Sequence, residues 1–253
     1  MEILNLSKEQ SENLLNLRKE KIQTLCLQKP VLANTKARVS LVLDFSGSMK
    51  KMYNNGTVQA IIERILPIAM KFDDDGEMEL WIFENGFKHL ESIDLSNYYG
   101  YVEEKILGKY SMGGTRYTPV IRDIEKTYMK DSPMKISNYV IFITDGDNDY
   151  SDKKTTTEAI TEMSKEPIFF QFVGIGHQES EFKYLRKLDE MEGRYVDNAN
   201  FFAIEDINSE SDDDIYNKLL AEFPGWLELP EVKEMIENQP DTPKKKGLFG
   251  LFK

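Results

Sequence analysis

Cysteine, histidine and positive charge are scarce in this sequence. Its 253 residues include one cysteine, Cys26, so no disulfide can form within the chain, and we expect a buried, small apolar side chain there. No run approaches the roughly eighteen apolar residues that span a bilayer. The start MEILNLSKEQ has neither the basic lead nor the apolar core of a signal peptide. These absences predict a soluble, cytoplasmic protein.

The charge balance and the missing motifs exclude several classes of function. Lys and Arg number 32 against 44 Asp and Glu, which gives a formal net charge of -12. Nucleic acid is therefore not an expected partner, because phosphate binding needs clustered basic side chains. The sequence lacks a GxxxxGKS or GxxxxGKT loop, a GxGxxG turn after a strand and a Ser/His/Asp order. His89 and His177 lie far apart, so we expect both to be structural or exposed.

What the sequence does contain is an alternation of apolar strands and amphipathic helices. The segments that read as strands are 39–43, 78–83, 139–143 and 168–173. The segments with helical spacing of apolar residues are one that begins at Thr57 and those at 97–107, 118–129, 155–164, 180–191, 215–223 and 232–236. Connections of helical length predict an α/β fold, a doubly wound and mainly parallel sheet with helices on both faces.

Segments outside this alternation divide the chain into four parts. Residues 1–36 are predicted as an N-terminal helical extension, 37–206 as the α/β domain, and 207–237 as C-terminal helices packed on it. Residues 238–253, NQPDTPKKKGLFGLFK, are predicted as a flexible tail because they have little apolar surface and much Pro, Gly and Lys. The lysines and the GLFGLFK motif suit docking into a partner's groove or contact with an anionic membrane, and a tail without a role is the third alternative.

Three separated fragments place oxygen-bearing side chains after predicted strands. LVLDFSGSMKK puts Asp44, Ser46 and Ser48 at alternating positions on one turn. SMGGTRYTP puts Thr115 after two glycines, which let the backbone approach closely, and ITDGDND puts Asp145 at the end of another strand. If the strands are neighbours, this cluster holds two carboxylates and no nitrogen or sulfur. Such a set predicts a site for a hard divalent cation, Mg²⁺ first and Mn²⁺ or Ca²⁺ next, and not for zinc.

Simpler interpretations of the same fragments stay open. DFSGS on its own is also typical of a helix-capping turn with Ser46 or Ser48 as the cap, and capping is compatible with metal binding by these serines. The later acids Asp147, Asp149 and Asp152 are expected to form a solvated loop, with an acidic rim or a second cation site as the alternative.

The fragments resemble the metal-ion-dependent adhesion site (MIDAS) of von Willebrand factor A (vWA) domains. DFSGS at 44–48, the GGT that ends at Thr115 and the TDG that begins at Thr144 match all of that family's ligand positions. The resemblance covers roughly residues 37–200. It implies the doubly wound sheet, usually with one antiparallel edge strand.

The resemblance also implies roles for the matched residues. Ser46, Ser48 and, in one state, Thr115 would bind the metal directly, while Asp44 and Asp145 would often act through water. Neutral hydroxyls cancel no charge, so an Asp or Glu of a partner can complete the octahedron. We therefore expect a protein-binding module in which a divalent cation is shared with the partner's carboxylate.

Further segments resemble the bacterial vWA proteins related to tellurium-resistance protein TerF. These segments are KFDDDGEMELWIF, NYYGYVEEKI, GGTRYTPVI and VIFITDGDNDYS. The resemblance implies a place in a bacterial tellurium or chemical-stress response complex.

An Mg²⁺-dependent phosphotransfer or phosphatase enzyme is the alternative function. An aspartate after a buried strand is also typical of enzymes that form an aspartyl phosphate, whose turn reads DxDx(T/V). In this sequence Ser46 occupies the position of the second Asp of that turn. No positively charged residue has an evident place to hold a phosphoryl group, so we do not expect an enzyme.

Overall fold

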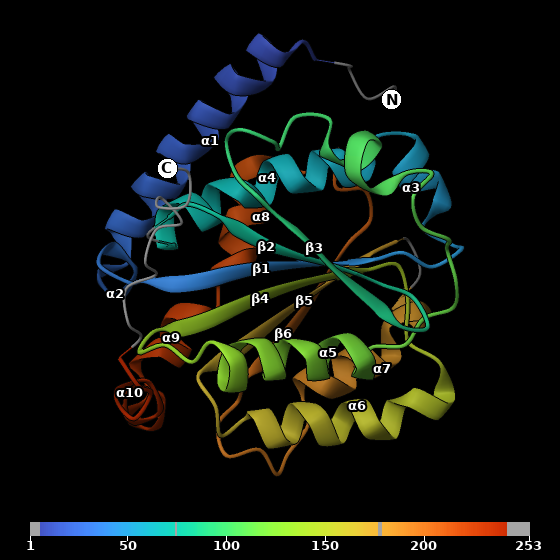
Figure 1. Ribbon diagram of the computed structural model, residues 1–253. Coiled ribbons are helices and arrows are strands. Elements are labelled where there is room, and N and C mark those ends of the chain that lie inside the picture. Colours follow the sequence, from blue (N-terminus) through green and yellow to red (C-terminus); the bar gives the residue numbers. More distant parts are fainter. Residues whose placement is uncertain (1–5, 74, 177–178, 242–253) are drawn as a thin grey trace, which may run out of the picture.

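A six-stranded sheet runs through the middle of the molecule in the order β3-β2-β1-β4-β5-β6 (Figure 1). The computed structural model describes residues 6–73, 75–176 and 179–241. All neighbouring strands are parallel except β3, which runs antiparallel to β2 at one edge. The strands are β1 (Ala37–Asp44), β2 (Met78–Phe83), β3 (Phe87–Ile93), β4 (Ser137–Thr144), β5 (Ile168–Ile175) and β6 (Ala199–Ile204).

The central strands are buried over their whole length. Every residue of β1, β4 and β5 is buried, which explains why their sequences are apolar runs and not alternating patterns. β1 and β4 pair in register, with Val39 opposite Tyr139 and Leu43 opposite Ile143. The two strands that end in an acidic turn are therefore neighbours at the centre of the sheet, as predicted.

Helices cover both faces of the sheet, which confirms the predicted α/β class. One face carries α1, α4, α8 and α9, and the other carries α5, α6 and α7 (Figure 1). The helices are α1 (Lys8–Gln28), α2 (Pro30–Ala33), α3 (Lys50–Asn54), α4 (Thr57–Phe72), α5 (Thr118–Glu125), α6 (Tyr150–Met163), α7 (Lys183–Asp189), α8 (Asp212–Leu219), α9 (Phe223–Glu228) and α10 (Pro230–Glu237). Shorter helical segments are η1 (Val102–Ile106), η2 (Lys126–Asp131) and η3 (Glu179–Phe182).

The N-terminal helix packs on α4 and joins an ionic cluster with it. The Ser7 hydroxyl accepts the Gln10 N–H and the Gln10 side chain accepts the Ser7 N–H, so α1 begins with a capping box. Between α1, α4 and α8, the Asp212 carboxylate lies 3.1 Å from Nε of Arg18 and 3.2 Å from Nε of Arg64. We call these last three residues the helix-layer ion cluster.

The C-terminal helices pack aromatic side chains against the sheet. The ring of Phe223 stacks on Tyr139 of β4 with centroids 4.4 Å apart, and the ring of Trp226 lies 5.5 Å from that of Phe169 in β5. Of the predicted tail 238–253, residues 242–253 lie outside the described residues. Its docking or membrane contact therefore stays a prediction.

Several predicted elements differ from the structure. The helix expected at 97–107 is reduced to the single turn η1, and α6 begins at Tyr150 and not at residue 155. The edge strand β3 is implied by the family resemblance alone, because most of its side chains are exposed or half-buried and form no apolar run. β6 and α9 are not among the predicted elements.

The isolated cysteine and histidine lie as expected. Cys26 is fully buried in the core that α1 shares with α4. His89 stacks on Trp81 with ring centroids 3.9 Å apart, and its Nε2 lies 2.9 Å from Oε2 of Glu79. His89 is therefore a structural side chain of the sheet edge, while His177 lies outside the described residues.

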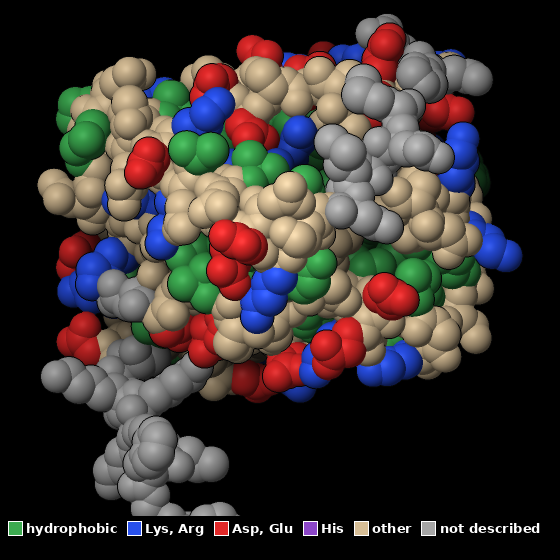
Figure 2. Space-filling model, turned by 90° about the horizontal axis from the view of Figure 1, so that it is seen from above, with side chains coloured by type: hydrophobic (Ala, Val, Ile, Leu, Met, Phe, Trp, Pro, Cys, Tyr) green, Lys and Arg blue, Asp and Glu red, His purple; other side chains and the backbone are tan. Residues whose placement is uncertain are grey.

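The surface above the α1 and α4 layer mixes charges of both signs. Figure 2 looks onto this layer and shows acidic and basic side chains interspersed, with hydrophobic side chains in small separate patches. Among the helices of the described residues, none has the length and apolar character needed to cross a membrane.

Candidate metal centre

The predicted site lies where the strand order reverses. The chain passes from β1 to β2 on one side and later returns to β4 on the other side of β1. The loops that follow two such strands separate and leave a crevice at their carboxyl ends, which is the usual ligand position in open α/β sheets. Asp44 is the last residue of β1, and Asp145 follows directly after β4.

Hydrogen bonds join four of the five predicted residues into one cluster. The backbone N–H of Ser46 donates to Oδ1 of Asp44 at 2.7 Å. The Oγ atoms of Ser46 and Ser48 are 3.0 Å apart, and the Ser48 hydroxyl donates to Oδ1 of Asp145 at 2.9 Å. Side chains from the ends of two strands thus converge at one point, as the sequence predicts.

The two carboxylates of the cluster lack a basic partner. Asp44 is fully buried, and burial raises its pKa to about 6, although hydrogen bonds from the Thr144 hydroxyl and from Ser46 lower it. Burial also raises the pKa of Asp145, while the Ser48 hydroxyl lowers it. Within the described part of the chain, neither carboxylate forms an ion pair with Lys, Arg or His. The negative charge of this cluster is therefore not balanced by side chains.

The loop that carries Thr115 is fixed beside the two serines by backbone contacts. Gly113 forms an isolated parallel β-bridge with Ser46, and the Gly47 N–H donates to the Gly113 carbonyl at 3.0 Å. The Thr115 carbonyl accepts the Asp149 N–H at 2.8 Å. The structure thus brings the loop of the fifth predicted residue to the same edge of the sheet.

The glycines before Thr115 lie in close contact with the side chains of two residues that follow β2, Glu84 and Asn85. A Cβ atom on Gly113 would lie 2.6 Å from Oε2 of Glu84, and one on Gly114 would lie 2.6 Å from Oδ1 of Asn85. A Cβ atom at either position therefore fits only if the ends of the Glu84 and Asn85 side chains shift. Glu84 and Asn85 are site residues that the sequence analysis misses, and the adjacent glycines are the only signal of a close neighbour.

Asp152 is buried, which corrects the expectation that it belongs to a solvated loop. It is fully buried and accepts the backbone N–H groups of Tyr117 at 2.7 Å and Thr118 at 3.2 Å. Burial alone raises its pKa, but hydrogen bonds from Asn148, Thr118 and the backbone outweigh this and hold the pKa below its usual value. Asp152 therefore anchors the start of α5 and the loop that carries Thr115.

The Asp147 carboxylate is also held by contacts within the protein. Its carboxylate accepts the backbone N–H of Tyr184 at 2.9 Å, near the start of α7, and lies 2.8 Å from Nζ of Lys153. Of the three acids in this loop, only Asp149 is exposed. Because Asp147 and Asp152 are held in hydrogen bonds within the protein, the structure does not support the alternative of a second cation site in this loop.

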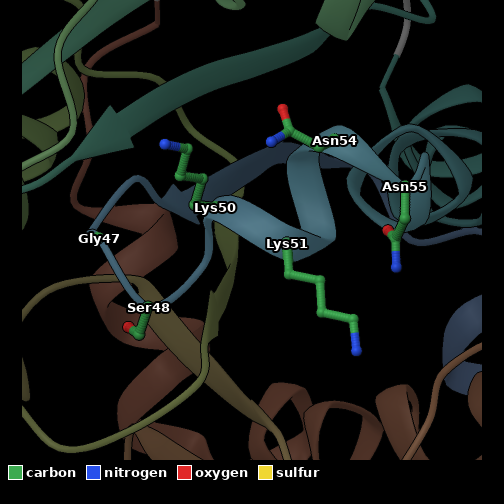
Figure 3. Close-up of a pocket in the computed structure, with 6 residues that line it drawn as sticks. All are labelled: Gly47, Ser48, Lys50, Lys51, Asn54 and Asn55. Carbon is green, nitrogen blue, oxygen red and sulfur yellow. The ribbon is translucent and has the colours of Figure 1, made fainter.

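An open hollow of about 530 Å³ lies beside Ser48 (Figure 3). Its lining residues belong to the serine loop and to α3 and its end, and they are Gly47, Ser48, Lys50, Lys51, Asn54 and Asn55. Two lysines therefore lie beside Ser48, although the sequence alone shows no positively charged residue with an evident place to hold a phosphoryl group. Only Met49 separates Ser48 from Lys50 and Lys51, which are the first two residues of α3.

The donor set fits a divalent cation bound by oxygen. In the described ranges no three His, Cys, Asp or Glu side chains gather to hold a metal, so hydroxyl groups must supply part of the coordination. The oxygen separations of 3.0 Å and 2.9 Å match the edge of about 3 Å that an octahedron with Mg²⁺–oxygen distances near 2.1 Å requires. A buried carboxylate without a basic partner completes the fit, since a cation would supply its counter-charge.

Sequence comparison finds a family and a bacterial relative. Residues 36–236 match the vWA-TerF-like family, described as a vWA domain found in the TerF C terminus. Over 241 residues the chain is 40% identical to the uncharacterized protein YcbR of Bacillus subtilis (strain 168), and the match covers 93% of this chain and 96% of the relative.

Solved structures share the fold at low identity. The vWA domain of SpRpn10 matches with a TM-score of 0.55 and 10% identity, over 73% of this chain and 95% of that domain. Proximal thread matrix protein 1 from the mussel byssus, in a structure with a zinc-occupied MIDAS motif, matches with a TM-score of 0.51 and 17% identity. That match covers 73% of this chain and 46% of the mussel protein, so this chain spans less than half of the mussel protein's length.

The fold, the position of the site at the strand reversal and the match over 36–236 agree with one another. This chain is a member of the vWA-TerF-like family.

Proposed function

We propose that this protein binds a divalent cation at the end of β1 and β4 and uses the ion to capture a carboxylate of a protein partner. The residues that would hold the ion are Asp44, Ser46, Ser48, Thr115 and Asp145. The observation that carries the proposal is the buried Asp44, which lies among hydroxyl groups and forms no ion pair with a basic side chain of the residues that the structure describes.

The chemistry of the cluster supports capture of an acidic group. Hydroxyl ligands add no negative charge, so an ion held mostly by them keeps much of its attraction for a further anion. Asp44 and Asp145 are both held by hydrogen bonds from neighbouring residues, which orients their oxygens toward the serines. An Asp or Glu side chain of a partner is an anion of the right size and hardness for the remaining position.

Mg²⁺ is the ion that we propose, with Mn²⁺ and Ca²⁺ as substitutes. All the proposed ligand atoms are oxygens, which hard cations prefer. The zinc reported in the mussel protein makes Zn²⁺ a necessary comparison. Calorimetric titration of the EDTA-treated protein with each chloride salt tests the proposal. We expect heat of binding with Mg²⁺ for the wild type and none for Ser46→Ala/Ser48→Ala.

A matched serine pair controls for general effects of these substitutions. Ser96 and Ser209 are exposed and their hydroxyls bond only nearby residues, so Ser96→Ala/Ser209→Ala should bind Mg²⁺ like the wild type. Equal binding by all three proteins, or binding of Zn²⁺ alone, would contradict the proposed site or the proposed metal.

Partner capture is tested by affinity purification from the native cell. The wild type in Mg²⁺ should recover a partner that EDTA releases and that Ser46→Ala/Ser48→Ala does not recover. Substituting the partner's acidic residues one at a time should then abolish recovery at a single Asp or Glu. A partner that stays bound in EDTA would contradict capture through a metal.

The proposed setting is a cytoplasmic complex of the bacterial tellurium or chemical-stress response. The support is the family description, which places the domain in the C terminus of TerF. A strain that lacks this chain, complemented with the wild type or with Ser46→Ala/Ser48→Ala, should grow in tellurite only with the wild type. Equal growth of both complemented strains would contradict this setting and leave the binding proposal standing.

Catalysis is not part of the proposal. Ser46 occupies the position of the second acid in aspartyl-phosphate enzymes, and a hydroxyl is a poor general acid or base at neutral pH. Lys50 and Lys51 do lie near the site, so the point needs a direct assay. Turnover of p-nitrophenyl phosphate in Mg²⁺ that Asp44→Asn abolishes would establish an enzyme.

A further inference from the structure

The hollow beside Ser48 is open and is lined by neutral residues and two lysines. Gly47 and Ser48 form one side, and Lys50 and Lys51 extend from the start of α3 in different directions (Figure 3). Asn55 accepts the Thr57 N–H through its Oδ1 at 3.0 Å, so its NH₂ group remains a hydrogen-bond donor. The hollow therefore offers donors and positive charge, and no carboxylate lines it.

Lys50 and Lys51 are adjacent in sequence, line the same hollow, and have no acidic partner among the described residues. Both are exposed, and no ion pair to either is found in the described part of the molecule. Other lysines pair closely, such as Lys21 with Asp213 at 3.0 Å and Lys153 with Asp147 at 2.8 Å. Although the chain has 44 acidic residues, the adjacent positive charges of Lys50 and Lys51 are not neutralised, so they can attract an anion of another molecule.

We propose that this hollow binds a second acidic side chain of the partner, next to the one that the metal captures. This inference rests on the proposed function, and it names the kind of segment that the site selects: a protein segment with two acidic residues close together in sequence. Lys50 and Lys51 attract the second carboxylate, and Ser48, which belongs both to the hollow and to the metal cluster, places the two acidic groups side by side.

An acidic protein segment fits better than a nucleic acid. A phosphate backbone presents many charges in a row and needs a long basic surface to compensate them. Here two lysines stand beside a site with two carboxylates in a chain of net charge -12. This arrangement repels an extended polyanion and admits a short segment with a second acid.

The test uses two pools of synthetic peptides in Mg²⁺. Peptides of the first pool carry a single central Asp in neutral random flanks. Peptides of the second pool carry the same Asp and one Glu within three residues of it. The wild type should retain the second pool roughly fivefold more than the first, a ratio in line with one or two exposed charge pairs. Lys50→Glu/Lys51→Glu should retain both pools equally or favour the first.

A matched control separates this effect from net charge. Lys187 on α7 and Lys233 on α10 are exposed and lie outside the hollow, so Lys187→Glu/Lys233→Glu changes the net charge equally and should keep the wild-type ratio. Added NaCl should reduce the ratio for the wild type and for this control, because exposed charge pairs are screened. For Lys50→Glu/Lys51→Glu, added NaCl should leave an equal ratio unchanged or bring a ratio that favours the first pool back toward one, because salt also screens the repulsion between the introduced carboxylates and the second acid.

The outcomes distinguish the two proposals. Equal retention of both pools by the wild type, with release of both by EDTA, would overturn the second acidic contact and support the metal site. The same pool ratio in Lys50→Glu/Lys51→Glu as in the wild type would also overturn it. No Mg²⁺-dependent retention of either pool would overturn the proposed function, and with it this inference.

Discussion

Two carboxylates in this molecule, the largely buried Asp212 and the fully buried Asp44, are stabilised in opposite ways. Asp212 in the helix-layer ion cluster contacts the guanidinium groups of Arg18 and Arg64. Asp44 at the end of β1 contacts a hydroxyl and a backbone N–H, and its pKa is raised to about 6 by burial. The first carboxylate is compensated by the protein itself, and the second is not.

Under the proposed function, this difference separates a structural carboxylate, Asp212, from one that takes part in binding, Asp44. A buried ion pair with two cations holds helices together but has no need of an outside group. A buried carboxylate without a cation costs free energy in the isolated chain, and a bound metal ion would remove that cost. Strongly shifted pKa values of buried carboxylates, such as that of Asp44, are typical of functional sites.

The largest effect that we predict comes from the compensated carboxylate. Asp212→Ala leaves two buried guanidinium groups without their anion, so the free energy of unfolding should fall by about 3 kcal/mol or more. Urea denaturation in EDTA measures it. Asp213→Ala is the matched control, because its pair with Lys21 is largely exposed, and it should cost less than about 1 kcal/mol. Equal losses in the two variants would remove the contrast between the two carboxylates.

The next effect comes from the uncompensated carboxylate. Mg²⁺ at a hundred times its dissociation constant should raise the free energy of unfolding of the wild type by about 2.7 kcal/mol, because it binds the folded chain only. Asp44→Asn should show almost no such rise. Asp94→Asn is the control, since Asp94 accepts the Ser96 N–H at 2.7 Å in the same local geometry but outside the site. A full Mg²⁺ effect in Asp44→Asn would contradict the metal site.

The smallest effect that we predict concerns Asp189, a half-buried carboxylate that is an intermediate case between Asp212 and Asp44. The pKa of Asp189 is raised to about 6, first by burial and then by the carboxylates of Glu222 and Asp197, although Arg194 lowers it. The folded state therefore binds a proton more tightly than the unfolded state, and stability from this group is lost as pH rises from about 4 through about 6. Asp189 is only half-buried, so solvent screening limits the effect to about 1 kcal/mol or less.

The measurement for Asp189 is a difference between two melting curves. In EDTA, Asp189→Asn should gain stability relative to the wild type on going from pH 4.5 to pH 7.5, because the amide cannot ionise. Asp44 contributes equally to both proteins and cancels. A difference that stays constant with pH, or that changes in the opposite direction, would contradict the raised pKa.

The fold was predictable where burial is complete. β1, β4 and β5 are covered on both faces, so each shows as an apolar run that ends in polar residues. β3 lies at the edge with exposed side chains, and no local pattern distinguishes it from a loop. Sequence reasoning therefore finds the centre of this sheet and misses its edges.

The candidate site was predictable only in the residues that form a motif. Asp44, Ser46 and Ser48 are adjacent in sequence, and Asp145 ends an apolar run, so chemistry and strand ends together indicate them. Asp152 looks like one more acid of a polar loop, because its partners, the N–H groups of Tyr117 and Thr118, are distant in sequence. Such roles depend on the packing of α5 against α6 and have no local signal.

The contact between the serine loop and the glycine loop uses only main-chain atoms. The Ser46–Gly113 bridge and the Gly47 N–H bond to Gly113 do not depend on which side chains surround them. Under the two proposals, homologues can therefore exchange residues such as Lys50 and Lys51, and so change the proposed partner, while keeping the same main-chain framework beside the proposed ion site. Divergence in specificity at this edge of the sheet requires no change of fold.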